Sequence, residues 1–129
     1  MLARLALDLL MMRYVFQKGR WGRWLHSYRE FDLWLEEGCI RQLVDLREPW
    51  MFEEMRICGS VNIPYRDVSW RQDEICCRGI VVFYCDRGAK SMAVCRDFWR
   101  RGYDAVDLAG GLLNYRGKYI DRTPIRALK

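Results

Sequence analysis

The sequence predicts an α/β fold with a central, mainly parallel sheet and helices on both faces. Short apolar, β-branched runs alternate along the chain with segments of helical spacing, which is typical of strand–helix–strand units. Of the 129 residues, 51% are hydrophobic and 14% aromatic. A chain of this length and composition can bury one core, so we expect one folded domain.

Residues 1–26 are predicted to form a basic, apolar helical arm ahead of the domain. They hold five Lys or Arg and one Asp, although the whole chain has a net charge of only +5. Apolar residues recur at three- and four-residue intervals, which places them on one face of a helix: Leu2, Leu5, Leu9, Met12 and Phe16. This face could pack on its own domain, pair in a homodimer or lie on an anionic membrane surface. Asp8 disfavours the membrane.

The domain, expected over 27–120, should begin with a capped helix and two strands. Ser27 with Glu30 three residues later is a capping box, and Gly38 is a plausible end of that helix. "RQLVDL" predicts a buried strand ending near Asp45, and "GSVNIP" predicts another that its proline closes. A short helix that begins with a proline is expected between them, over 49–54.

The second half of the domain continues the alternation. Residues 66–75 are expected to form a short helix, and "IVVFY" at 80–84 is the clearest strand. A helix is predicted over 90–101, ended by Gly102, with these residues inward: Met92, Val94, Cys95, Phe98 and Trp99. "AVDLA" predicts a strand and "GLLNYRG" a last short helix, before a polar tail over 121–129.

Composition excludes several classes of function. Outside the arm, cations and anions are nearly balanced, so we expect no nucleic-acid partner. The six cysteines form no C-x-x-C pair and the chain has one histidine, so we expect no metal and no cofactor. Charged residues interrupt the apolar start, which disfavours a signal peptide and predicts a cytoplasmic protein with reduced thiols.

Cys85 is the candidate catalytic residue. It directly follows the apolar strand, and the turn residue Gly88 and a helix follow it. The first amides of a helix have no intrahelical partner and can point at an anion. Arg87 and Lys90 add positive charge. These features favour a thiolate without a histidine, because the single histidine, His26, lies in the arm.

The sequence resembles the rhodanese-like, single-domain sulfurtransferases over roughly 27–120. Four segments carry the resemblance: "LVDLREP", "CGSVNIP", "YCDRGAKS" and "GYDAVDLAGGLLNY". The resemblance implies a three-layer fold in which Cys85 takes sulfane sulfur as a persulfide and passes it to a thiophilic acceptor. The donor would be thiosulfate or a persulfide, carried by a small molecule or by a protein. Substrate-binding positions would be Asp86, Arg87, Gly88, Ala89, Lys90, Ser91 and Arg47.

Two departures from the family pattern and several alternative interpretations follow. Lys90 stands where many relatives have arginine, and the carboxylate of Asp86 should oppose dianionic donors. Arg47 could equally form an ion pair with Asp45 or Glu48. A phosphatase loop would need arginine six positions after the cysteine, where Ser91 stands. A non-enzymatic binding or regulatory module of the same fold is the main alternative to an enzyme.

Overall fold

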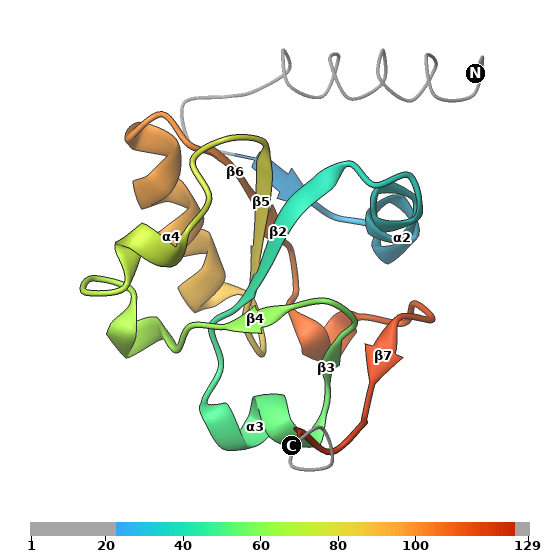
Figure 1. The fold of residues 1–129 in the computed structure, drawn as a ribbon. Coiled ribbons are helices and arrows are strands. Elements are labelled where there is room, and N and C mark those ends of the chain that lie inside the picture. The colour runs from blue at the N-terminus through green and yellow to red at the C-terminus, as the bar shows by residue number, and fades with distance from the viewer. Residues whose placement is uncertain (1–22, 126–129) are drawn as a thin grey trace, which may run out of the picture.

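The computed structural model describes residues 23–125, and the predicted arm helix lies outside the described residues. A five-stranded sheet runs through the molecule in the order β1-β6-β5-β2-β4, and all its pairs are parallel. Its strands are β1 (Arg23–Leu25), β2 (Ile40–Asp45), β4 (Val61–Asn62), β5 (Ile80–Tyr84) and β6 (Asp104–Leu108). The predicted α/β fold with a mainly parallel sheet is confirmed (Figure 1).

Helices cover both faces of the sheet. Helix α2 (Tyr28–Glu36) lies on one face and α4 (Ala89–Arg100) on the other (Figure 1). The Ser27 side chain accepts hydrogen bonds from the amides of Arg29 and Glu30, so the predicted cap is present. Helix α3 (Pro49–Glu54) starts at its proline, as predicted, and lies beyond the end of β2.

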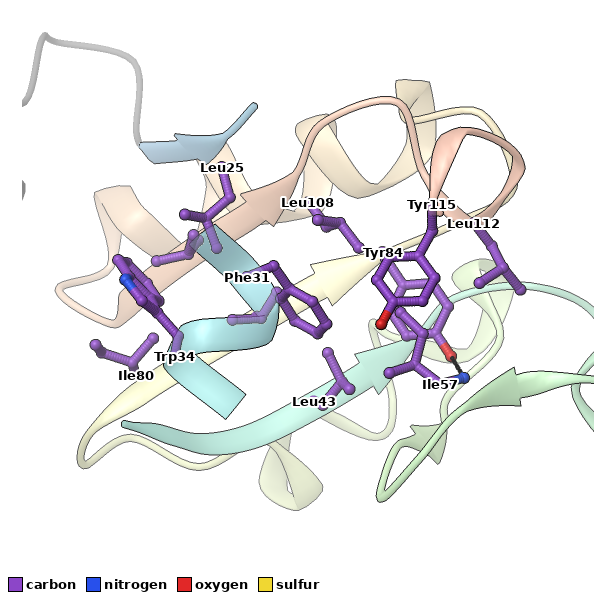
Figure 2. Close-up of a cluster of buried hydrophobic side chains, with 12 residues drawn as sticks. Leu25, Phe31, Trp34, Leu43, Ile57, Ile80, Tyr84, Leu108, Leu112 and Tyr115 are labelled. Carbon is purple, nitrogen blue, oxygen red and sulfur yellow. Dashed lines mark hydrogen bonds between the residues drawn. The ribbon is translucent and has the colours of Figure 1, made fainter. Parts of the chain in front are cut away.

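Each face of the sheet has its own apolar cluster. Every residue of β5 is buried, because the strand is central and helices cover both of its faces. Val82 and Tyr84 pack toward α2 with Phe31 and Trp34, in the cluster shown in Figure 2. The alternate residues Val81 and Phe83 pack toward α4, in a cluster with Val94, Cys95 and Phe98.

A small second sheet joins the segment after α3 to the C-terminal end of the domain. Strands β3 (Arg56–Ile57) and β7 (Ile120–Asp121) pair antiparallel. The Arg56 guanidinium donates to the Asp121 carboxylate (3.2 Å) and to the Thr123 carbonyl (2.7 Å). The beginning of the predicted polar tail is therefore bound to the domain.

Several local predictions differ from the structure. Arg23–Leu25, expected within the arm, form the edge strand β1 beside β6. The helix expected over 66–75 is two 3₁₀ turns, Tyr65–Asp67 and Gln72–Glu74, because the segment lacks a continuous apolar face and Trp70 between them is 70% exposed. The last helix is also a 3₁₀ turn, Leu112–Asn114.

The predicted inward face of α4 is partly wrong. Met92 is 37% exposed, whereas Ser91, Val94, Cys95 and Phe98 are buried. The buried positions follow the three- and four-residue spacing that starts at Ser91, and Met92 lies one residue off that face. A serine is thus the first inward residue of the helix.

Candidate active site

Cys85 lies at the centre of the carboxyl edge of the sheet. It directly follows β5, which is the middle strand in the order, and β2 and β6 on either side end at the same edge because all three are parallel. This edge is where parallel sheets bind ligands. The side chain is only 4% exposed, so the thiol is nearly enclosed by its own loop.

Backbone amides of the following loop point at the sulfur. The Gly88 amide donates to Cys85 Sγ at 3.0 Å and the Ser91 amide at 3.4 Å. The Ser91 hydroxyl oxygen lies 3.4 Å from the same sulfur. Because α4 starts at Ala89, its unpaired first-turn amides also face this edge. The loop is therefore arranged to stabilise negative charge on Cys85 Sγ.

Glycines permit this tight arrangement at two points. Gly88 has a φ of +109°, which lets the chain curl into α4, and a Cβ there would lie 3.1 Å from the Gly110 nitrogen. A Cβ at Gly111 would lie 2.5 Å from the Asp86 carbonyl oxygen. The next residue, Leu112, donates its amide to the Cys85 carbonyl at 2.9 Å. The double glycine, Gly110–Gly111, thus packs directly against the backbone of the loop that contains Cys85 and supports it.

A pocket of about 300 Å³ adjoins the thiol. It is lined by Leu46, Arg47, Glu48, Met51, Cys85, Asp86, Arg87, Ala89 and Lys90. Arg87 and Lys90 are exposed, and Lys90 Nζ lies 5.6 Å from the centre of the Tyr65 ring. Among the described residues, neither cation forms an ion pair. The volume and the cations suit a small anionic group.

The comparison with known families agrees with this geometry. Residues 27–118 match the family model for the rhodanese-like domain. The chain belongs to the rhodanese-like domain family.

Relatives and solved structures of this family share the region. "Uncharacterized protein YqhL" of Bacillus subtilis is 33% identical over 60% of this chain and 62% of its own length. "Putative sulfurtransferase YtwF" of the same species is 29% identical over 59% of this chain and 74% of its own. A rhodanese-related protein of Thermoplasma volcanium superimposes with a TM-score of 0.71 at 19% identity, over 78% of this chain and 99% of its own.

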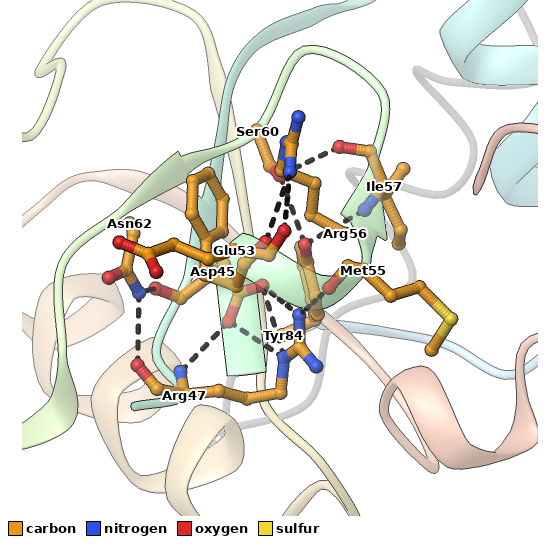
Figure 3. A network of polar contacts seen from close by, with 10 residues as sticks. Asp45, Arg47, Glu53, Met55, Arg56, Ile57, Ser60, Asn62 and Tyr84 are labelled. Carbon is orange, nitrogen blue, oxygen red and sulfur yellow. Dashed lines mark hydrogen bonds and ion pairs between the residues drawn. The ribbon is translucent and has the colours of Figure 1, made fainter. Parts of the chain in front are cut away.

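The rhodanese-like segment "LVDLREP" builds a buried ion pair beside the site. The Arg47 guanidinium donates to both oxygens of Asp45, with Nη2 at 2.7 Å from Oδ2, and also to the Met55 carbonyl (Figure 3). Burial lowers the pKa of Arg47, but hydrogen bonds and the charge of Asp45 together raise it above its ordinary value. The side-chain amide of Asn62, in "CGSVNIP", donates to the backbone carbonyls of Asp45 and Arg47.

Arg47 therefore forms an ion pair, one of the possibilities that the sequence left open, and its partner is Asp45. Glu48 pairs instead with Arg66. Arg47 still lines the pocket, so a substrate contact by its remaining donors stays a prediction. The other predicted positions, 86–91, lie together around Cys85, with Asp86 half-buried and Ser91 turned into the protein interior.

Sequence reasoning missed three residues of the pocket and one buried carboxylate of the sheet. Leu46 and Met51 line the pocket as its apolar wall, and Glu48 adds a carboxylate to it. Asp107 lies on the α4 face of β6 and is 1% exposed. The signal for Asp107 was present, since a carboxylate interrupts the otherwise apolar strand segment "AVDLA". Its face could not be assigned without the packing of α4.

Residues 23–125 contain no group of His, Cys, Asp or Glu placed to hold a metal ion. No helix in that range has the length and apolar character required to cross a bilayer.

Proposed function

We propose that this rhodanese-like protein is a sulfurtransferase in which Cys85 carries sulfane sulfur as a persulfide. The observation that carries the proposal is the position of Cys85 Sγ within hydrogen-bond distance of the Gly88 and Ser91 amides, beside a pocket lined by Arg87 and Lys90 as well as by Asp86 and Glu48. A thiolate there is both enclosed and accessible from one side. The "Putative sulfurtransferase YtwF" of Bacillus subtilis supports the same class of reaction.

The transfer divides into two displacements. In the first, the Cys85 thiolate attacks the sulfane sulfur of the donor, an S–S bond to Cys85 forms, and the donor's own S–S bond breaks to release sulfite or a thiolate. In the second, a thiophilic acceptor attacks the outer sulfur, and Cys85 leaves as a thiolate. Both leaving and attacking species are anions, so the amides that hold Cys85 Sγ assist each step.

The pocket favours a small donor group or the end of an extended one. Its volume of about 300 Å³ is at the lower limit of ligand pockets. Arg87 and Lys90 attract an anion, while Asp86 opposes a second negative charge near the sulfur. We therefore propose a singly charged persulfide, free or on a carrier protein, as a better donor than dianionic thiosulfate.

The test compares the wild type and Cys85→Ser with thiosulfate and with a low-molecular-weight persulfide, using cyanide as acceptor. We expect the wild type to transfer sulfur, faster from the persulfide, and Cys85→Ser to transfer none while keeping its fold. Transfer by Cys85→Ser at the wild-type rate would overturn the assignment. A wild type inactive with both donors would favour the non-enzymatic binding module instead.

A further inference from the structure

A second pocket lies beside the active site, and the two displacement steps leave it without a role. Its volume is about 420 Å³, against about 300 Å³ for the pocket beside Cys85. Helix α4 forms one wall, and the segment 65–74, which holds two 3₁₀ turns, forms the other (Figure 1). Its lining includes Tyr65, Arg66, Gln72, Ala93, Asp97 and Arg101.

Two neighbouring residues of the first 3₁₀ turn separate the second pocket from the active site. Lys90 belongs to the pocket beside Cys85, and its Nζ lies 5.6 Å from the centre of the Tyr65 ring. Glu48, in the same pocket, forms an ion pair with Arg66. Each contact joins a residue of one pocket to a residue of the other. The two pockets are therefore neighbours, with only these side chains between them.

Both pockets also lie along one face of α4. Lys90 lines the first pocket, and Ala93, Asp97 and Arg101 line the second. These positions follow three- and four-residue spacing, which places them on one side of a helix. The helix rises ~10 Å over the seven residues from Lys90 to Asp97. A molecule that extends from the active site into the second pocket therefore spans about this distance along α4.

The second pocket presents both signs of charge on exposed side chains. Arg101 pairs with Asp97, with Nη2 at 2.7 Å from Oδ2, and also donates to the Gln72 side chain at 2.7 Å. The Asp97 and Arg101 side chains are 56% and 38% exposed. An exposed ion pair adds little stability, so both groups can turn to a ligand that carries the same two charges. An α-amino-acid group, with an ammonium and a carboxylate on one carbon, is such a ligand.

We propose that the second pocket binds the body of a short peptidic persulfide, the donor from which Cys85 takes its sulfur. A chain of about two to three residues covers ~10 Å, since an extended residue spans at most about 3.6 Å, whereas thiosulfate and cysteine persulfide are too short. The α-amino-acid end meets Asp97 and Arg101 while the persulfide enters the pocket beside Cys85. The inference rests on the proposed sulfur transfer and adds the class of donor.

The kinetic test compares how fast a long and a short donor load Cys85 with sulfur. Glutathione persulfide carries its α-amino-acid group at the far end of a γ-glutamyl chain, and cysteine persulfide lacks that extension. Cleavage after Arg78 and Arg87 gives a peptide, 79–87, in which Cys85 is the only cysteine, so mass spectrometry follows this thiol alone. We expect the wild type to load about tenfold or more faster from the longer donor at low concentration, because only this donor gains hydrogen bonds to charged groups.

Two pairs of variants locate the effect in the second pocket. Ala93→Trp should fill the pocket and reduce loading from glutathione persulfide to the rate of the short donor, without changing the rate of the short donor. Met92→Trp is its control, because Met92 is the adjacent exposed residue of α4 and lines neither pocket. Arg101→Gln should also lower the preference for the longer donor. Arg100→Gln should not, since Arg100 is exposed outside both pockets.

A binding measurement on Cys85→Ser separates this inference from the sulfur transfer itself. S-methylglutathione has the body of the longer donor without a reactive thiol, and calorimetry follows its binding. We expect Cys85→Ser to bind it, and a further Ala93→Trp change to weaken binding about tenfold or more, through loss of the same contacts. Binding by a protein that transfers no sulfur would refute the proposed function and leave the second pocket as a ligand site.

Two results would overturn the second pocket as the donor site. One is the absence of S-methylglutathione binding. The other is an Ala93→Trp variant that keeps the wild-type preference, or that loses both donors equally, since an equal loss would show a disturbed active site. If Ala93→Trp does not fold, equal preferences in Arg101→Gln and Arg100→Gln would overturn the inference instead.

Discussion

Gly111→Ala should disable the cysteine loop without touching a charged or nucleophilic group. Gly111 has a φ of +66°, and a Cβ there would lie 2.5 Å from the Asp86 carbonyl oxygen and 2.6 Å from that of Cys85. Ordinary contact begins at 3.4 Å, so the loop or the glycine segment must move by about 0.9 Å. Both neighbours are backbone atoms, which cannot rotate away.

Comparing Gly111→Ala with a control substitution separates the cost of the steric clash from the cost of placing a side chain at positive φ. A residue with a side chain at positive φ costs roughly 1–3 kcal/mol. Gly38→Ala is the matched control, because Gly38 has a φ of +69° and nothing lies within 4 Å of its added Cβ. We expect Gly111→Ala to lose at least ~2 kcal/mol more unfolding free energy than Gly38→Ala, and its transfer rate to fall about 100-fold, the effect of a misplacement near 1 Å.

Denaturant unfolding and the cyanide-coupled transfer rate of the folded protein measure the two effects. Gly38→Ala should keep the wild-type rate, since Gly38 lies at the end of α2 and contributes nothing to the pocket. The support assigned to the double glycine would be refuted if Gly111→Ala kept its rate within about twofold and lost no more stability than Gly38→Ala.

Further predictions concern charged residues and the start of the chain. Because burial raises the pKa of Asp107 from 3.8 to about 6, the folded state binds the proton more tightly than the unfolded state. The wild type should therefore lose roughly 3 kcal/mol of stability relative to Asp107→Asn as pH rises from about 3 to about 7, measured by urea unfolding. Lys90→Ala should slow transfer from anionic donors, and more so at low ionic strength, whereas Asp86→Ala should speed thiosulfate use; equal rates at all salt concentrations would contradict the role of Lys90. A chain that starts at residue 23 should keep sulfur transfer, while one that starts at 27 lacks β1 and exposes the edge of β6. Light scattering of the full chain and of the chain that starts at 23 tests a homodimer formed through the arm. The same number of copies in both would exclude that dimer.

The strands and the position of Cys85 could be predicted because local sequence determines them. The apolar run at 80–84 has the composition of a doubly covered strand, and it places Cys85 at a strand end in any parallel arrangement. The alternation of strands and helices then predicts the edge at which the thiol lies. The Gly88 turn was also visible as a glycine between a strand and a helix.

Other features depend on long-range packing and could not be predicted from local sequence. Arg23–Leu25 form a strand because β6 offers an unpaired edge, and three residues alone carry no strand pattern. The inward position of Ser91 depends on the rotation of α4 about its axis, which apolar spacing placed about one residue away. Asp107 faces the same interior only because β6 turns that side toward α4.

The contact between the double glycine and the cysteine loop could not be predicted from local sequence either. Gly111 lies 26 positions after Cys85, and nothing between them indicates that the two backbones touch. The sequence left open whether Arg47 pairs with Asp45 or with Glu48. Only the three-dimensional structure shows that Arg47 and Asp45 are buried together as a pair.

The mass of peptide 79–87 tests the persulfide on Cys85 most directly. The protein is incubated with the persulfide donor, freed of excess donor, digested without reductant after blocking free thiols, and compared with a portion first treated with cyanide. We predict that the peptide gains one sulfur atom on Cys85, and that cyanide removes it with formation of an equal amount of thiocyanate. A peptide that stays unmodified while the intact protein still transfers sulfur would contradict the proposed role of Cys85.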